Sequence, residues 1–258
     1  MSELYNKRVL VTRPRKDYKH FAQLLSKYGA EPVPFPVIKI APVSDSQIPQ
    51  KAFEELGHFD WLVFTSANGV KMLDRYAPKL TLPPLLKVAA VGPKTAEAIQ
   101  KRGWQADVVP ERYVAKAILQ GLGNISGKRI LLARGNLSDQ EFPAEMRALG
   151  ADVTDLVVYR TDRANPDPKS YQQFRRSVDV ITFTSASAVF SFVSIIKDAG
   201  MDIFQLPGNP IFAYIGPITS KAAQDNNLPL NVIAQQHTLE GLVDALIQYY
   251  SAEIVKSQ

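Results

Sequence analysis

Two stretches of sequence decide the fold, DWLVFTSANGV at Asp60–Val70 and DVITFTSASAV at Asp179–Val189, and they lie 119 residues apart. Each begins with an aspartate, continues as a short apolar run, and passes through Thr-Ser into a stretch with helical spacing. A short apolar run that leads directly into a helix is typical of a buried strand in a parallel sheet. The repetition predicts that one strand–turn–helix unit occurs twice in the chain.

Two further pairs of segments repeat in the same order. KRVLVT at 7–12 returns as KRILLA at 128–133, and VGPKTAEA at 91–98 returns as IGPITSKA at 215–222. Their separations, 121 and 124 residues, nearly match the first one. Strand–turn–helix units resemble one another by chance, but here the turn residues match as well as the apolar ones. An internal duplication is therefore the favoured interpretation.

Each copy alternates runs rich in Val and Ile with stretches of helical periodicity, such as Phe21, Leu24, Leu25 and Tyr28. This alternation predicts α/β domains, each with a doubly wound parallel sheet covered by helices on both faces. A length of 258 residues fits two such domains, since a domain has roughly 150 residues. The predicted strands are 8–13, 31–35, 61–65, 88–91 and 106–109 in the first copy, and 129–134, 152–158, 179–184, 211–215 and 230–234 in the second.

Two extended stretches interrupt the alternation at equivalent positions, FPVIKIAP at 35–42 and VVYRTDRA at 157–164. If they form a two-stranded linker, the chain leaves one domain early and returns to it late. The sequence permits this arrangement without requiring it. The predicted parts are a discontinuous domain at 1–36 plus 165–258, an inserted domain at 44–156, and linker strands at 37–43 and 157–164.

The formal net charge of +5 is concentrated at one end of the chain. Residues 1–40 hold eight basic and three acidic side chains, whereas the remaining residues hold equal numbers of both. A nucleic-acid-binding face normally has a denser stripe of Lys and Arg. We therefore expect an acidic small molecule as the partner and no nucleic acid.

Membrane and export signals are absent from the sequence. The N-terminal residues run directly into an apolar strand without a signal-peptide core, and no apolar run approaches the ~20 residues of a spanning helix. We expect a cytoplasmic protein that does not bind membranes. A mature form that has lost its leader is the alternative.

The residue types exclude several kinds of site. The chain has no cysteine, and its three histidines, His20, His58 and His237, lack metal-ligand spacing. No G-x-G-x-x-G, P-loop or G-x-S-x-G motif occurs. Carboxylates are scarce at the predicted strand ends, which argues against a magnesium–phosphate site and a paired-carboxylate hydrolase. We expect no metal and no cofactor.

Chemistry is expected at the strand-to-helix turns, because ligands of open α/β sheets bind beyond the carboxyl ends of the strands. Pro14, Pro93 and Pro217 suit the first helical position, and Ser66 and Ser185 suit N-caps. Helix N-termini also bind anions, whereas for any single turn simple capping is an equal alternative. These hydroxyl-rich turns are residues 12–16, 65–68, 92–95, 184–187 and 216–219.

Two further features point to an acidic ligand and an asymmetric reaction. Arg15 and Lys16 fall in the first turn of a helix, where positive charge opposes the helix dipole and costs ~0.3–1 kcal/mol each. A bound anion would compensate, and a solvated, salt-screened face is the alternative. Tyr159 aligns with Ile38 in the repeat, so only one linker has a reactive hydroxyl. Packing between the linker strands is the alternative role of this ring.

Eight short segments together carry a family resemblance: LVTRP (10–14), FTSANGV (64–70), AVGPKTA (90–96), LLARG (131–135), VVYRT (157–161), FTSASAV (183–189), IGPITSKA (215–222) and HTLEGLVDAL (237–246). In this order and spacing they resemble the uroporphyrinogen-III synthase family over nearly the whole chain. The resemblance implies two flavodoxin-like domains joined by a two-stranded linker, with the active site in the cleft between them.

The resemblance also implies a reaction. Enzymes of this family close hydroxymethylbilane, a linear tetrapyrrole with eight carboxylates, with loss of water and inversion of the last pyrrole ring through a spiro intermediate. They need no metal or organic cofactor, and their main task is to position the substrate so that inversion wins over unaided closure. A proton donor near the leaving hydroxyl would assist the reaction.

By resemblance, Tyr159 is the expected catalytic proton donor. Thr95 and Thr219 match substrate-contacting threonines, and Ser66 and Ser185 match helix-capping serines. The expected substrate-binding residues are Arg13, Arg15, Ser66, Ala67, Lys94, Thr95, Ser185, Ala186 and Thr219.

The expected partner is a polycarboxylate tetrapyrrole, handed over by the preceding enzyme of the pathway to a monomer. A two-domain binding protein that closes on an acidic ligand without chemistry is the alternative function. A two-lobed glycosyl or phosphoryl transferase is disfavoured by the missing phosphate loop.

Overall fold

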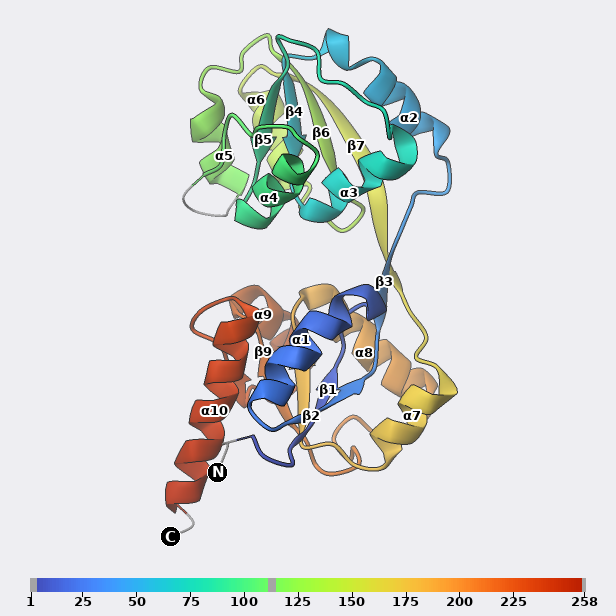
Figure 1. Ribbon diagram of the computed structural model, residues 1–258, viewed down its shortest axis with the longest axis vertical. Coiled ribbons are helices and arrows are strands. Elements are labelled where there is room, and N and C mark those ends of the chain that lie inside the picture. Colours follow the sequence, from blue (N-terminus) through green and yellow to red (C-terminus); the bar gives the residue numbers. More distant parts are fainter. Residues whose placement is uncertain (1–3, 111–114, 257–258) are drawn as a thin grey trace. The chain divides into compact units, whose positions relative to one another are not determined.

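The computed structural model describes residues 4–110 and 115–256, which form two compact units (Figure 1). The first unit comprises Met1–Lys39 and Asp162–Gln258, and the second comprises Ile40–Thr161. The second unit is thus an insertion within the first.

The chain passes between the units within two strands, β3 (Ile38–Ala41) and β7 (Asp152–Arg163) (Figure 1). They are hydrogen-bonded neighbours. The predicted strands 152–158 and 157–164 are one continuous strand, β7, because no turn residue separates them. The predicted domain segments 1–36, 44–156 and 165–258 all fall inside the observed units.

The first unit contains a five-stranded sheet in the order β10-β9-β8-β1-β2, and each neighbouring pair is parallel. Numbered along the chain within this unit, the order is 2-1-3-4-5, which is that of a flavodoxin-like sheet. Its strands are β1 (Arg8–Val11), β2 (Glu31–Pro34), β8 (Val180–Phe183), β9 (Ile211–Tyr214) and β10 (Val232–Ile233).

The second unit contains a sheet in the order β3-β7-β6-β4-β5, in which β7, β6, β4 and β5 run parallel. The predicted strand at 106–109 is reduced to a single bridge between Val108 and Ala89. The remaining strands are β4 (Trp61–Phe64), β5 (Lys87–Ala90) and β6 (Arg129–Gly135).

The sequence repeat and the two units do not coincide. The repeated segments place β1 opposite β6, β4 opposite β8, and β5 opposite β9. Each five-stranded sheet therefore takes three strands from one copy and two from the other, and the equivalent strands β9-β8-β1-β2 and β5-β4-β6-β7 follow the same spatial order. The two copies meet within each sheet, where β1 pairs with β8 and β4 pairs with β6.

Helices cover both faces of each sheet. In the first unit α1 and α10 pack on one face through residues such as Phe21 and Leu242, and α7, α8 and α9 pack on the other through Phe174 and Phe192. The first unit's helices are α1 (Arg15–Lys27), α7 (Pro168–Arg175), α8 (Ala186–Asp198), α9 (Pro217–Asp225) and α10 (Leu239–Lys256). The second unit's are α2 (Gln47–Glu54), a short 3-10 helix (Leu56–His58), α3 (Ala67–Tyr76), α4 (Pro93–Lys101), α5 (Ala115–Leu122) and α6 (Glu141–Ala148).

The strand residues alternate between the two faces, as period-two geometry requires. Leu10 belongs to the aromatic-rich cluster under α8, whereas its neighbours Val9 and Val11 belong to the cluster under α1 and α10. All three side chains are fully buried. Such two-sided burial explains why these strands are continuous apolar runs.

The aspartate that opens each repeated segment anchors a neighbouring strand. Asp60 accepts a hydrogen bond from the backbone N–H of Arg129 at 2.8 Å, and Asp179 accepts one from the N–H of Arg8 at 2.7 Å. The bond from Arg129 lowers the pKa of Asp60, to which Lys128 also contributes. The two carboxylates satisfy the first donors of β6 and β1, which aligns the central strands of both sheets.

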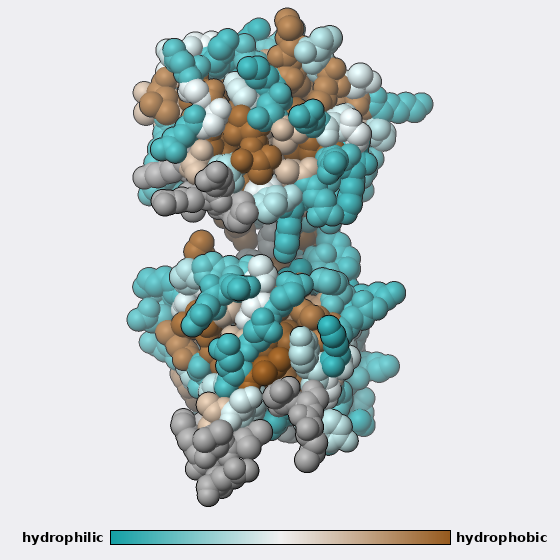
Figure 2. Space-filling view, turned by 60° about the vertical axis from the view of Figure 1, so that its left-hand side comes forward, coloured by the Kyte–Doolittle hydropathy of each residue, from teal (hydrophilic) through white to brown (hydrophobic). Residues whose placement is uncertain are grey.

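No helix in the described part of the chain is long and apolar enough to cross a membrane. On the face drawn in Figure 2, hydrophilic residues surround smaller hydrophobic patches on both units. Among the exposed apolar side chains, Leu137 and Ile218 follow the carboxyl ends of β6 and β9.

Candidate functional site

Tyr159 and Ser66 meet at the carboxyl end of the second unit's sheet. The Tyr159 hydroxyl lies 2.9 Å from Ser66 Oγ, and the tyrosine side chain is 8% exposed. Ser66 is the N-cap of α3, where its Oγ accepts hydrogen bonds from the N–H groups of Asn68 and Gly69 at 3.2 and 3.4 Å. The tyrosine from the predicted linker therefore touches one of the predicted hydroxyl-rich turns.

Gly135 makes room for the tyrosine ring. A Cβ at this position would lie 2.5 Å from Tyr159 Cζ and 2.8 Å from its hydroxyl oxygen, which is closer than any side chain allows. The two residues are register partners, next to a shift in the pairing of β6 with β7. Asn136 holds the same stretch of β7, since its N–H donates to the Tyr159 carbonyl at 3.1 Å and its Oδ1 accepts from the Thr161 N–H at 2.7 Å.

The next turn of the second sheet contains Thr95 and Lys94. Gly92 is the N-cap residue of α4 and has no side chain to form a capping hydrogen bond. Pro93 takes the first helical position, as predicted. Thr95 is buried, with 5% exposure, whereas Lys94 is exposed. Thr65, which precedes Ser66, has a buried Oγ1 without a hydrogen-bond partner in the described residues.

The corresponding turns of the first unit are built in the same way. Ser185 is the N-cap of α8 and accepts from the Ala188 N–H at 3.2 Å. Gly216 caps α9 with Pro217 at the first helical position, and the Thr219 side chain is buried. His237 packs so close to Gly216 that a Cβ there would lie 2.8 Å from its Cδ2. Ala67 and Ala186 are the first residues of α3 and α8 and directly follow the capping serines.

Pro14 corrects one prediction. It is the N-cap of α1, with ψ 144°, and not the first helical residue. Arg15 takes that first position and forms an ion pair with Asp167, the N-cap of α7. The N–H of Ser170 chiefly lowers the pKa of Asp167, and Arg15 adds to this shift. The charge of Arg15 at the start of a helix is thus compensated within the protein.

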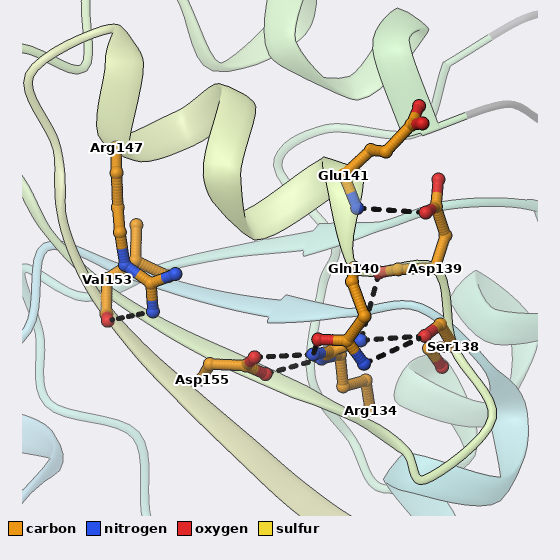
Figure 3. A network of polar contacts seen from close by, with 8 residues as sticks. All are labelled: Arg134, Ser138, Asp139, Gln140, Glu141, Arg147, Val153 and Asp155. Carbon is orange, nitrogen blue, oxygen red and sulfur yellow. Dashed lines mark hydrogen bonds and ion pairs between the residues drawn. The ribbon is translucent and has the colours of Figure 1, made fainter.

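The repeat places Arg13 just after β1 and Arg134 near the end of β6, but the two arginines differ in their partners. Arg134 is 3% exposed at its side chain and forms an ion pair with Asp155. Its other donors reach the carbonyls of Ser138 and Asp139 and the Oε1 of Gln140 (Figure 3). This network satisfies the buried charge, so Arg134 is a structural residue.

Arg13, the equivalent residue of the first unit, has no such carboxylate. Pro34 occupies the position that corresponds to Asp155. The Arg13 guanidinium donates to Thr184 Oγ1 at 3.1 Å and to the Asp17 carbonyl at 3.3 Å. Burial lowers the pKa of Arg13, and the nearby charge of Asp17 partly opposes that shift.

The predicted residues thus form two separate sets. Ser66, Ala67, Lys94, Thr95 and Tyr159 lie at the carboxyl edge of the second sheet. At the carboxyl edge of the first sheet lie Arg13, Arg15, Ser185, Ala186 and Thr219. No cluster of metal-binding side chains occurs in the described residues.

Sequence reasoning missed Gly135, Asn136 and His237. The clue to Gly135 was the LLARG segment, in which the glycine directly follows the repeated arginine. The signal for His237 is its position at the start of the HTLEGL segment, since its spacing from the other histidines excludes only a metal site.

Comparison with known proteins gives concordant matches. Residues 19–244 match the family described as "Uroporphyrinogen-III synthase HemD". The "Uroporphyrinogen-III synthase" of Synechococcus elongatus is 28% identical over 95% of this chain and 96% of its own length. The "Porphyrin biosynthesis protein HemD" of Ruminiclostridium josui is 25% identical over 95% of this chain, which spans 49% of that longer protein.

Solved structures agree on the fold. A mutant uroporphyrinogen III synthase from Thermus thermophilus superposes with a TM-score of 0.66 at 20% identity, covering 95% of this chain and 99% of the other. The Helicobacter pylori uroporphyrinogen-III synthetase gives a TM-score of 0.62 at 16% identity, covering 94% and 99%. These similarities establish an α/β fold with parallel sheets.

Proposed function

Because the chain belongs to the uroporphyrinogen-III synthase family, we propose that it closes hydroxymethylbilane to uroporphyrinogen III, with loss of water and inversion of the last pyrrole ring. The observation that carries this proposal is the Tyr159 hydroxyl held against the N-cap of α3. The Tyr159 hydroxyl offers a proton at the carboxyl edge of a parallel sheet, where ligands of α/β folds bind.

The hydrogen bonds of Ser66 favour a particular direction for the tyrosine proton. Ser66 Oγ already accepts from two backbone N–H groups, which engages its lone pairs. Its own proton is then donated to the Tyr159 oxygen, and the phenol proton is left free for a ligand. Tyr159 would give that proton to the leaving hydroxyl, which departs as water, and would recover it from the ring carbon that loses a proton on closure.

The remaining work of such an enzyme is positioning. The N-termini of α4 and α9 have no side-chain caps, so their backbone N–H groups suit carboxylates. Thr95 and Thr219 lie in the first turns of these two helices. We propose that residues at the carboxyl edges of both sheets contact the same tetrapyrrole. Transfer from the preceding enzyme and a monomeric state stay predictions.

The test supplies freshly prepared hydroxymethylbilane to the purified protein and separates the uroporphyrin isomers after oxidation. The type III isomer should exceed its level in a protein-free control. An isomer ratio equal to that control would contradict the proposal. Saturable binding of the tetrapyrrole without conversion would identify the chain as a binding protein instead.

A further inference from the structure

A bulge in β7 decides which way the Tyr159 side chain points. Arg134 is the register partner of Val157, and the next residue of β6 is the partner of Tyr159, so Val158 is one extra residue on β7. Regular alternation along a strand would place Val158 and Tyr159 on opposite faces of the sheet. Instead, both side chains are buried in the same cluster, which also holds the apolar residues of α3. The bulge therefore turns the tyrosine toward α3, as bulges beside functional sites re-aim side chains.

Asn136 fixes the chain directly after the bulge. Its backbone N–H donates to the Tyr159 carbonyl at 3.1 Å, and its Oδ1 accepts from the Thr161 N–H at 2.7 Å. One residue of β6 thus holds both the residue that carries the ring and the second residue after it. Thr161 is the last residue of the second unit. These two hydrogen bonds therefore fix β7 before the chain passes to the first unit.

This clamp occurs in only one of the two copies of the repeat. The residue equivalent to Asn136 is Arg15, whose side chain forms an ion pair with Asp167 instead. Ile38, the equivalent of Tyr159, has no polar group to orient. Within residues 4–110 and 115–256 the Nδ2 of Asn136 donates no hydrogen bond, so its accepting oxygen is the part of the side chain that has a partner there. The clamp is present where a hydroxyl has to be placed.

We propose that Asn136 is a positioning residue for Tyr159, which locks the bulge in β7 and so holds the tyrosine hydroxyl against Ser66. The inference rests on the proposed function, in which that hydroxyl donates a proton. Asn136 acts through the backbone of β7 and exchanges no proton itself. A shift of register by one residue turns a side chain to the other face of a sheet, so relaxation of the bulge moves the ring away from Ser66.

Asn136→Ala removes the accepting oxygen and leaves the backbone bond to Tyr159 in place. In the isomer assay, kcat should fall about tenfold while KM changes less than about twofold, because the loss concerns the placement of the proton donor. Asn136→Asp keeps an oxygen that accepts from Thr161 and should retain kcat within about threefold of wild type. A kcat of Asn136→Ala within twofold of wild type would overturn the inference, and so would equal losses in the two variants.

Asn231→Ala is the matched control, because Asn231 Oδ1 accepts from a strand N–H in the same way, from Phe212 at 2.9 Å in the first unit. Both alanine variants should lower the urea midpoint of unfolding by similar amounts, but only Asn136→Ala should lower kcat. Added to Tyr159→Phe, Asn136→Ala should reduce kcat less than twofold further, since its effect passes through the missing hydroxyl. Fully additive losses, or equal kcat losses in the two alanine variants, would contradict a positioning role.

Nuclear magnetic resonance on the full chain tests the inference without the reaction. Hydrogen exchange of the Thr161 amide should be at least tenfold faster in Asn136→Ala and should return to near the wild-type rate in Asn136→Asp. The nuclear Overhauser effect between the Tyr159 ring and the Ser66 Cβ protons should fall by at least half in the alanine variant only.

The two kinds of measurement separate this inference from the proposed function. If both resonance signals change as described while wild type forms no type III isomer, the positioning of Tyr159 by Asn136 stands and the proposed function fails. If wild type forms the type III isomer but neither signal responds to Asn136→Ala, the positioning inference fails alone.

Discussion

The hydroxyl oxygen of Tyr159 and the Oγ of Ser66 lie 2.9 Å apart, which joins β7 to the first turn of α3. The serine has two tasks, since it also caps the helix through the N–H groups of Asn68 and Gly69. Ser185, its counterpart in the repeat, caps α8, and among the described residues its Oγ otherwise forms a hydrogen bond only with the Ser187 hydroxyl. A comparison of Ser66 with Ser185 therefore separates the effect of helix capping from the effect of positioning Tyr159.

Replacing Tyr159 by phenylalanine should lower kcat at least ~10-fold, because the ring stays and the proton donor is lost. KM for hydroxymethylbilane should change little. Both parameters are obtained by stopping the reaction at set times and quantifying the type III isomer. An unchanged kcat would leave the tyrosine with a packing role only.

Ser66→Ala and Ser185→Ala should each cost ~0.5–2 kcal/mol in the free energy of unfolding, since each removes one N-cap. Only Ser66→Ala should also reduce kcat, because it alone releases the Tyr159 hydroxyl. Urea unfolding and the isomer assay on both variants make the comparison. Equal kcat values in the two variants would argue against the positioning role of Ser66.

Gly135→Ala should displace the tyrosine ring, since the new methyl group would overlap Cζ and the hydroxyl oxygen. We expect kcat to fall at least ~10-fold, as small misplacements of a reacting group do. Gly57→Ala is the control, because a Cβ there meets nothing within 4 Å. Combined with Tyr159→Phe, Gly135→Ala should cause little additional loss of kcat, and two fully additive losses would show that glycine acts through another group.

Asp155→Asn should destabilise the protein by ~3 kcal/mol, because it leaves the buried Arg134 charge without a carboxylate. Asp225→Asn removes an exposed pair with Lys221 and should cost less than ~1 kcal/mol. Urea denaturation at neutral pH measures both. Similar losses of stability in the two variants would mean that solvent stabilises the Arg134 charge when the carboxylate is removed.

Asp60 should make stability depend on pH in the acid range. Its pKa is lowered in the folded protein, so its contribution is complete above the unfolded value, about 3.9, and is lost as pH falls through the folded value. Asp60→Asn should be less stable than wild type at pH 6 by about 1 kcal/mol or less, since the carboxylate is exposed to solvent screening. The difference should shrink on titration from pH 6 to pH 2, and a constant difference would exclude the carboxylate as its origin.

The sequence alone predicted most of the fold, because the deciding signals are local. Buried strands such as Leu62–Phe64 are apolar runs, and Ser66 and Ser185 mark helix starts through their own side chains. The prediction of a strand at 106–109 was wrong, because such a strand depends on pairing with β5 and only the Ala89–Val108 bridge forms. The predicted position of Pro14 was wrong, because a proline is compatible with both the N-cap and the first helical position.

The site was predictable only in part, because partners distant in sequence decide what a side chain does. Arg13 and Arg134 have the same place in the repeat, and their difference arises from Asp155 in one unit and Pro34 in the other. Contact of Tyr159 with Gly135 depends on the register of β6 and β7, which no periodicity reveals.

The crossing of sequence copies between the two sheets has a consequence for assembly. A chain with only the first copy would contain β1 and β2 of one sheet and β4 and β5 of the other. It would lack the second-copy strands that pair with them in each sheet. Two such chains that exchanged halves would rebuild both sheets, as domain-swapped dimers do. In this respect the protein is equivalent to a swapped pair of protomers fused end to end, in which the covalent join between the copies makes a two-molecule assembly a one-molecule fold.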